Sequence, residues 1–237
     1  MTARNRRDAG GDENTAGATT TPATTLMPVT ARGEATRRRI LDAAEEVFGE
    51  MGYYEASVSE ITRRAGVAQG TFYIYFHSKR ETFVELIEDI GRRLRTETSA
   101  AIQDAPDRIE AERRGFAAFF RFVYEHRRIY RIVEDAGRVA PEAVREYYQR
   151  ISSGYERGLR AAIEAGQIRE TNVEALGYAL MGIGHFLALR WIIWPAEGEG
   201  GGSEQAPARV PETIIPESAF NALLEFIAHG LTPHDEK

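Results

Sequence analysis

The chain contains no cysteine among its 237 residues, which excludes a disulfide framework, a thiolate metal site and a cysteine nucleophile. No segment alternates apolar and polar residues as a half-buried strand would, and no internal repeat is present. The chain also lacks a Ser/His/Asp order, a phosphate-cradling glycine loop, a paired-carboxylate site and a metal-ligand spacing. We therefore expect a helical protein without catalytic activity, metal or cofactor.

Charge and composition set wider limits. A formal net charge of -6 argues against a protein that coats nucleic acid in general, but it permits a local basic strip that binds one DNA site. Hydrophobic residues make up 43% of the chain, enough for a substantial core in one large or two moderate domains. Residues 1–31 are rich in Thr, Ala and Gly, and we expect a disordered tail there. No apolar region follows the basic residues near the N-terminus as in a signal peptide, and no window approaches an uncharged membrane span, so we expect a soluble cytoplasmic protein.

The segment from Val67 to Lys79 is too aromatic for a helix that faces solvent on all sides. Phe72 and Phe76 are four residues apart and can share one buried face. The other face carries hydrogen-bond donors and acceptors of the kind that read base edges in the major groove. The pattern predicts a DNA recognition helix whose outward residues are Gln69, Thr71, Tyr73 and Tyr75.

The residues before this segment supply the first helix of a helix-turn-helix pair. Ser57 and Glu60 form a capping box that starts a short helix, and Gly66 supplies the left-handed residue that ends it. Two short helices joined by a turn that contains glycine are the helix-turn-helix arrangement. Further upstream, residues 36–51 have apolar side chains at helical spacing, with Gly52 as the expected end of that helix.

Taken in order, residues 35–86 resemble the tetracycline-repressor (TetR) family of bacterial transcription regulators. The resemblance rests on a helix followed by the strings GY, SVSEI, AGV, GTFYIYF and SKRETF, all in register. It implies a homodimer on a near-palindromic operator, with base and phosphate contacts from the recognition helix and a phosphate contact from Lys79. The chain departs from the family at Ala68, where Ser or another capping residue is frequent, so the free backbone donors there are available to a phosphate. The candidate DNA-binding residues are Arg37, Arg38, Ser57, Ser59, Gln69, Gly70, Thr71, Tyr73, Tyr75 and Lys79.

Two groups of these residues have a plainer interpretation. Tyr73 and Tyr75 could cover the helix surface without touching a base. Arg37, Arg38 and Arg39 could form a solvated first turn of their helix. Positive charge at that end opposes the helix dipole, and this unfavourable placement favours a phosphate-binding role.

From Ser78 onward the pattern is helical throughout. The helix before Pro195 is apolar on most of its circumference, so we expect it to be buried on several sides. The segment from Ala196 to Ile215 is rich in Gly and Pro, and we expect a mobile loop. The last two helices carry more apolar surface than one small domain covers, and in the family that the chain resembles they form a four-helix dimer interface. Helices are predicted from Lys79 to about Ala101, around Phe116, around Tyr130, from Pro141 to Gly166, from Thr171 to Pro195 and from Pro216 to His229.

An aromatic and aliphatic set on these helices could line a cavity for a hydrophobic effector. The plainer interpretation is core packing, because a ladder of Phe and Tyr at helical spacing fills a core more often than a pocket. His185 has no second His, Asp or Glu three or four places away, so we expect no metal site there. The candidate ligand-binding residues are Phe116, Phe119, Phe120, Tyr124, Tyr147, Ile151, Tyr155, Met181 and His185.

These observations predict an all-α protein with a tail over residues 1–31, a helix-turn-helix DNA-binding domain over 32–80, and a larger helical domain over 81–237 for effector binding and dimerisation. The expected function is that of a ligand-responsive transcription regulator, and more specifically a repressor. An effector would tilt the helix that begins at Lys79 and change the separation, ~34 Å, of two recognition helices. The segment Tyr130–Asp135 is similar to lipid regulators of the family, which implies a fatty acyl or acyl-thioester effector. The alternative is a helical adaptor or small-molecule-binding protein that does not bind DNA.

Overall fold

The computed structural model of the chain describes residues 30–194 and 214–232. All regular structure in these residues is helical, as predicted. Residues 1–29 of the tail predicted over 1–31 and most of the predicted Gly- and Pro-rich loop lie outside the described residues, whereas Thr30 and Ala31 form the start of the first helix. The elements are α1 (Ala31–Met51), α2 (Val58–Ala65), α3 (Gln69–Tyr75), α4 (Lys79–Ile102), α5 (Arg108–Glu125), α6 (Ile129–Val139), α7 (Pro141–Glu164), α8 (Val173–Ala188), a π-helical turn (Leu189–Ile193) and α9 (Glu217–Leu231).

Side-chain caps set the starts of several helices at the predicted places. The Ser57 hydroxyl accepts the backbone N–H of residue 60 at 3.1 Å, and the Ser78 hydroxyl accepts that of residue 81 at 3.1 Å. Gly66 ends α2 in the left-handed region with a φ of 64°. Helix α1 begins earlier than the predicted Thr36, because the Thr30 hydroxyl caps it by accepting the N–H of residue 33 at 3.1 Å.

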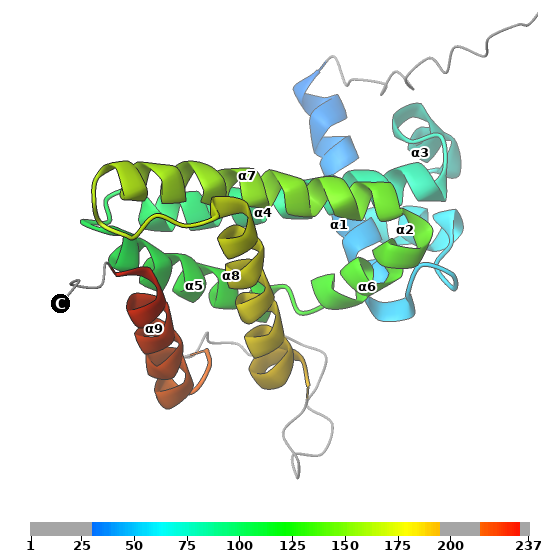
Figure 1. Ribbon diagram of the computed structural model, residues 1–237. Coiled ribbons are helices and arrows are strands. Elements are labelled where there is room, and N and C mark those ends of the chain that lie inside the picture. The colour runs from blue at the N-terminus through cyan, green and yellow to red at the C-terminus, as the bar shows by residue number, and fades with distance from the viewer. Residues whose placement is uncertain (1–29, 195–213, 233–237) are drawn as a thin grey trace, which may run out of the picture.

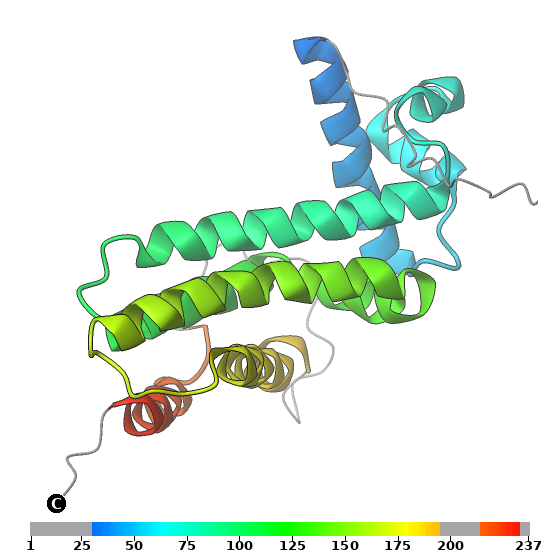
Figure 2. The same cartoon turned by 45° about the horizontal axis from the view of Figure 1, so that its top comes forward.

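Two long helices, α4 and α7, run side by side along the molecule (Figure 2). Helix α5 packs against α4, α8 packs against α7, and α9 packs against α5 (Figure 1). Helices α1, α2 and α3 gather around the first turns of α4, at the end remote from the turn between α4 and α5 (Figure 1). Helix α6 packs against α1 as well as α7. Helix α3, the predicted recognition helix, is therefore held at one end of a larger helical body.

The apolar core of the N-terminal helices does not stop at residue 80. A single cluster of buried side chains, including Phe48 and Phe72, continues through α4 to Ile132 of α6. A second cluster joins α5, α7, α8 and α9 around Phe120 and Leu159. Because α6 contributes side chains to the first cluster, a displacement of α6 would shift the side chains that pack beneath α1 to α3.

Helix α8 contradicts the expectation that it is buried on several sides. Phe186 is 66% exposed, and Phe226 on α9 is 70% exposed. Only 28% of the most apolar stretch of Val173–Ile193 is buried, and this segment is long and apolar enough to cross a membrane by length and composition alone. Glu174 and Arg190 leave 15 residues between them, so the segment is not an uncharged span of membrane length. An apolar circumference indicates contact with something apolar, and it does not show that the contact lies within the same chain.

Candidate functional site

Helix α3 divides its side chains between a buried face and an outward face, as predicted. Phe72 and Phe76 are buried, whereas Gln69 is exposed and Tyr73 is 46% exposed. Ile74 is 60% exposed and was not predicted as a contact residue. Its place two residues from each buried phenylalanine puts it on the opposite side of the helix, so helical spacing could have identified it. An exposed aliphatic side chain there is suited to the methyl group of thymine.

The first turn of α3 is open. Ala68 provides no side-chain cap, as its sequence indicated, and a Cβ placed on Gly70 would meet no atom within 4 Å. A close approach by a DNA backbone is therefore sterically possible at this turn. Thr71 and Tyr75 are only half-exposed, and Tyr75 packs against the N-terminal core. This packing favours the plainer interpretation for Tyr75.

Ser57 and Ser59, at the start of α2, are both exposed. The Ser57 hydroxyl is used as the cap of α2. The Ser59 carbonyl accepts the Thr62 hydroxyl at 3.0 Å, and the Ser59 hydroxyl makes no hydrogen bond to any described residue. Of the two, Ser59 has the hydroxyl that is freer to bind a DNA phosphate.

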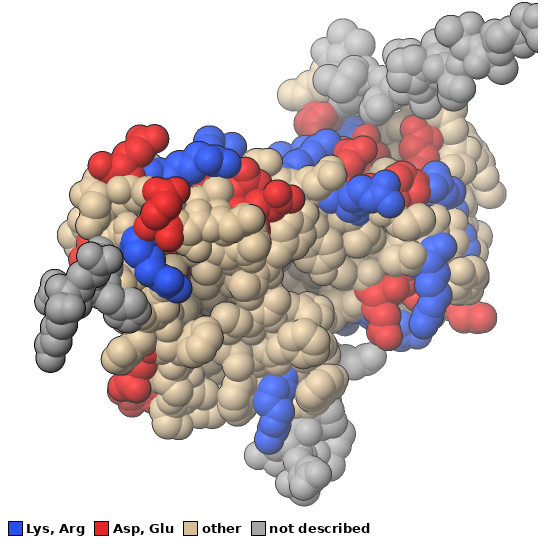
Figure 3. All heavy atoms as spheres, in the orientation of Figure 1, with Lys and Arg blue, Asp and Glu red and all other residues tan. Residues whose placement is uncertain are grey.

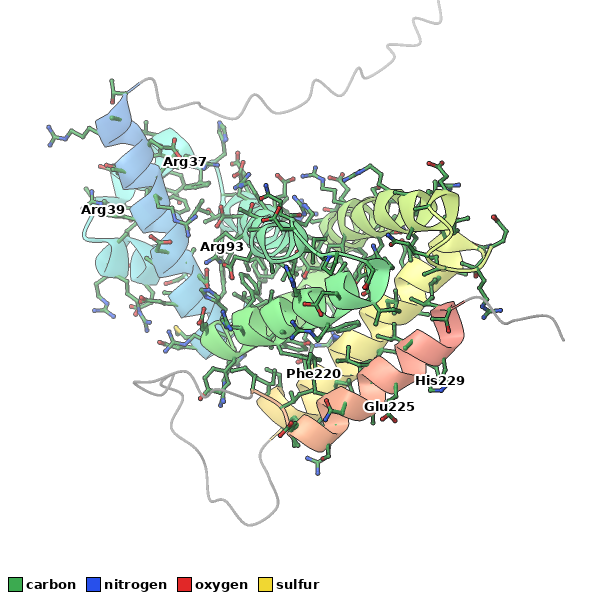
Figure 4. All side chains as sticks on the ribbon, turned by 90° about the vertical axis from the view of Figure 1, so that its left-hand side faces the viewer. Arg37, Arg39, Arg93, Phe220, Glu225 and His229 are labelled. Carbon is green, nitrogen blue, oxygen red and sulfur yellow. The ribbon has the colours of Figure 1, made fainter. Side chains whose placement is uncertain are left out.

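Arg37 and Arg38 are directed to carboxylates of α4. Arg37 pairs with Glu85, and Arg38 pairs with the buried Asp89 at 2.8 Å. Arg39 is exposed and lies on the side of α1 away from Arg37 (Figure 4). The ion pairs brace α1 against α4, so a phosphate would have to compete with these carboxylates for Arg37 and Arg38. The phosphate contacts of these two residues stay a prediction.

Lys79 holds the turn between α1 and α2. Its ammonium donates to the carbonyl oxygens of Tyr53 and Ala56, both at 2.8 Å, and lies 4.4 Å from the centroid of the Tyr53 ring. Partial burial lowers the pKa of the Lys79 ammonium. The predicted phosphate contact is untested, and the same ammonium now has a structural partner on its own chain.

Helix α6 is hydrogen-bonded to the end of α1 and to the turn that follows it. The Asp135 carboxylate accepts the backbone N–H of Tyr53 at 2.7 Å. The Arg131 guanidinium donates to the Met51 carbonyl at 3.1 Å, and Arg128 pairs with a carboxylate of α1 at 3.0 Å. These contacts attach α6 to the N-terminal helices at several points.

A cavity of about 530 Å³ lies between α4, α5, α7 and α8, with α6 at one end. This volume falls in the range of small-molecule sites, ~300–1,000 Å³. Helix α6 contributes Ile129, Tyr130 and Val133 to the lining. Seven of the nine predicted ligand-binding residues also line it, namely Phe116, Phe119, Tyr147, Ile151, Tyr155, Met181 and His185.

Phe120 and Tyr124 do not line the cavity, contrary to the prediction. The Phe120 ring packs 6.3 Å from that of Phe220 on α9, and the Tyr124 ring lies 4.5 Å from the Arg127 guanidinium. Each step of four residues along an α-helix rotates the side chain by about 40°. Phe120 is one such step from Phe116 and Tyr124 is two, so both side chains turn away from the cavity side of α5.

The polar part of the lining was not predicted. Arg95, Arg150 and Arg157 line the cavity on α4 and α7. Burial lowers the pKa of the Arg95 guanidinium, and the nearby charge of Arg150 lowers it further. Arg108 and Glu112 also line the cavity and form an ion pair, which is 9% and 2% exposed respectively. Their spacing of four indicates a pair on one helix face, but no sequence signal shows that this face borders a cavity.

The N-terminal helices resemble known proteins in sequence. Residues 40–86 match the model of a family described as bacterial regulatory proteins, tetR family. The chain is 42% identical over 71 residues to the uncharacterized HTH-type transcriptional regulator YdgC of Bacillus subtilis (strain 168), which covers 30% of this chain and 36% of that protein. It is 45% identical over 51 residues to the fatty acid metabolism regulator protein of the same organism, which covers 22% and 26%. The chain therefore spans at most 36% of the length of these two relatives.

Solved structures extend the likeness to the rest of the fold. The transcriptional regulator FadR from Bacillus subtilis in complex with stearoyl-CoA has a TM-score of 0.65 at 21% identity, covering 81% of this chain and 98% of that one. The fatty acid degradation regulator FadR from Bacillus halodurans has a TM-score of 0.62 at 23% identity, covering 66% and 84%. At these identities the likeness shows a shared fold.

Proposed function

Because the chain belongs to the TetR family of bacterial regulatory proteins, we propose that it is a ligand-responsive transcriptional repressor of the cytoplasm. It acts as a homodimer on a near-palindromic operator and has no catalytic activity. The observation that carries this proposal is that one helix, α6, borders the cavity and is also hydrogen-bonded to the N-terminal helices. A ligand in the cavity can thereby bias the position of the DNA-binding surface.

The outward face of α3 is the surface that enters the major groove. Gln69 is exposed there and can make a bidentate contact to adenine, and Tyr73 and Ile74 extend the same face. The open first turn at Gly70 lets the DNA backbone approach the free N–H groups of the helix. Ser59 of α2 and Arg39 of α1 are exposed candidates for phosphate contacts, which fix the register without reading sequence.

A second copy of the chain covers the apolar surface of α8 and α9. The face of the molecule over these helices carries few charged side chains (Figure 3). Exposed aromatic side chains on it would be unusual for a monomer, because large contiguous apolar patches mark interaction sites. A two-fold arrangement would place two copies of α3 one turn of DNA, ~34 Å, apart. The aromatic residues exposed on this surface are Tyr178, Phe186, Trp191, Trp194 and Phe226.

The effector is an amphipathic molecule with a long apolar chain and an anionic portion, of which a long-chain acyl thioester is the candidate. The interior of the cavity is lined by aromatic and aliphatic side chains, which suits an acyl chain. Arg95, Arg150 and Arg157 supply positive charge where α4 and α7 border the cavity, and Arg150 and Arg157 are exposed. Guanidinium groups in this position favour phosphate groups of the ligand. The name of one relative and the ligand of one similar structure point in the same direction.

Two helices carry the ligand's effect to the DNA-binding surface. Helix α4 lines the cavity with Leu94 and holds α1 through Arg37, Arg38 and Arg93. Helix α6 lines the cavity and holds the turn after α1. A ligand that fits only one arrangement of α4 and α6 shifts the population toward that arrangement, and the separation of the two recognition helices changes with it.

The proposal is tested by selecting DNA from a random pool with the purified full chain. The selected sequence is then titrated by fluorescence anisotropy, and the mass of the complex is measured by light scattering. The expected result is an enriched near-palindromic sequence bound by two copies of the chain. A pool without any enriched sequence would contradict the proposal and favour the helical adaptor or small-molecule-binding protein instead.

A further inference from the structure

One end of the cavity contains a buried ion pair. Arg108 and Glu112 lie in the first turns of α5, at the end remote from α1 to α3 (Figures 1 and 2), and the Nη2 of Arg108 donates to Oε1 of Glu112. Burying this charged pair costs more free energy than burying a well-packed apolar pair of similar volume. Packing alone therefore does not account for charges at this position, and we ask whether they bind part of the ligand.

The Arg108 guanidinium has unused donors. Its Nε is buried and has no hydrogen-bond partner among the described residues, and its Nη1 makes no hydrogen bond to them either. Gly158 of α7 makes room for the group, since a Cβ at that position would lie 2.5 Å from Nη1. The Tyr155 ring borders the same space, 5.8 Å from Cζ of Arg108, and its hydroxyl makes no hydrogen bond to any described residue. A buried donor without an acceptor is costly, and a ligand oxygen can supply the missing acceptor.

The charge balance selects the kind of oxygen. Arg108 and Glu112 already neutralise each other, so a carboxylate of the ligand would add an uncompensated negative charge beside Glu112. Burial raises the pKa of the Glu112 carboxyl even beside Arg108, which shows how poorly this end of the cavity solvates negative charge. A neutral acceptor such as a carbonyl oxygen meets the free donors without this cost.

We propose that Arg108 binds the carbonyl oxygen of an acyl ester or thioester and thereby orients the ligand in the cavity. The proposal rests on the effector class given above. The acyl chain then runs from Arg108 toward Ile129 and Val133 of α6, and the anionic remainder leaves past Arg150 and Arg157 of α7. In this orientation the end of the acyl chain lies against α6, the helix that is hydrogen-bonded to the N-terminal helices.

The test compares two ligands that differ only in the carbonyl group, stearoyl-CoA and its thioether analogue S-octadecyl-CoA. Their dissociation constants for the full chain are measured by titration calorimetry below the concentration at which they form micelles. A hydrogen bond to a charged donor predicts that the thioester binds roughly tenfold to a hundredfold more tightly than the thioether. This comparison on the unaltered chain needs no variant that has to fold.

The double variant Arg108→Met/Glu112→Leu replaces the ion pair with apolar side chains and avoids leaving one charge buried alone. It should bind both ligands equally, at the level of the thioether on the parent. Arg114→Met is the matched control, because Arg114 lies on the same helix, pairs with a carboxylate and does not line the cavity. The control should keep the full preference for the thioester.

Equal binding of the two ligands by the parent would overturn the carbonyl contact while leaving the acyl effector class intact. Persistence of the preference in the double variant, with its helical content and melting temperature close to those of the parent, would overturn the role of Arg108. A parent that binds neither ligand would instead remove the acyl effector class, and the carbonyl contact with it.

Discussion

Replacement of Asp135 with Ala should weaken the coupling between ligand binding and DNA binding. The carboxylate accepts the N–H of Tyr53 at 2.7 Å, in the turn after α1, while Val133 on the same helix borders the cavity. A hydrogen bond to a charged group contributes about 1.5–3 kcal/mol. The coupling free energy between two sites is usually of similar size, about 1–3 kcal/mol, or about 5–150-fold in affinity. Loss of this one bond is therefore large enough to remove a measurable part of the coupling through α6.

The assay is the ratio of operator affinities without and with saturating stearoyl-CoA, measured by fluorescence anisotropy. Asp135→Ala should bring the ratio closer to one, while the Arg128 and Arg131 contacts of α6 and the ion pairs between α1 and α4 keep the remainder. Asp135→Asn should keep more of the ratio than Asp135→Ala, because the amide oxygen still accepts the Tyr53 N–H without the charge. Glu134→Ala is the control, since Glu134 is the exposed neighbour on α6, and its ratio should equal that of the parent. An unchanged ratio in Asp135→Ala would refute the transmission through this contact.

Three further substitutions test other parts of the account. Phe226→Glu places a charge on the exposed apolar surface of α9 and should weaken dimerisation at least tenfold, about 1.4 kcal/mol, by analytical ultracentrifugation; a dimer of unchanged stability would place the interface elsewhere. Lys79→Ala should lower the free energy of unfolding by about 1 kcal/mol in urea, because two carbonyl oxygens lose their donor. A fall of about 1 in the salt slope of DNA binding would support the predicted phosphate contact as well. If both the stability and the salt slope stay unchanged, Lys79 has neither role. Ile151→Trp fills part of the cavity and should weaken stearoyl-CoA binding in calorimetry at least tenfold, whereas undiminished binding would place the ligand outside this cavity.

Local features of the fold were predictable because their causes are local. The hydroxyls of Ser57 and Ser78 bond to N–H groups three residues away, and the left-handed conformation of Gly66 needs no distant partner. The division of α3 into two faces follows from the spacing of Phe72 and Phe76 alone. The helix-turn-helix and the two faces of α3 could therefore be predicted from the sequence.

Contacts between distant segments were not predictable from one sequence. The dipole argument for Arg37 and Arg38 considered only their own helix, but the carboxylates that they meet, Glu85 and Asp89, come from α4. Aromatic spacing on α5 correctly indicated an apolar face, but it did not show at which residue that face turns from the cavity to α9. The burial of the Arg108 charge likewise could not be predicted from the sequence, because the residues that border its guanidinium come from another helix, α7.

We expect occupation of the cavity and binding of DNA to be coupled, and the reciprocity of that coupling can be measured. Stearoyl-CoA affinity is measured by calorimetry for the free chain and for the chain saturated with its selected operator. The operator should weaken stearoyl-CoA binding by the same factor, at least about fivefold, by which stearoyl-CoA weakens operator binding, because coupling free energy is reciprocal. Stearoyl-CoA affinity that is identical with and without operator would contradict the account.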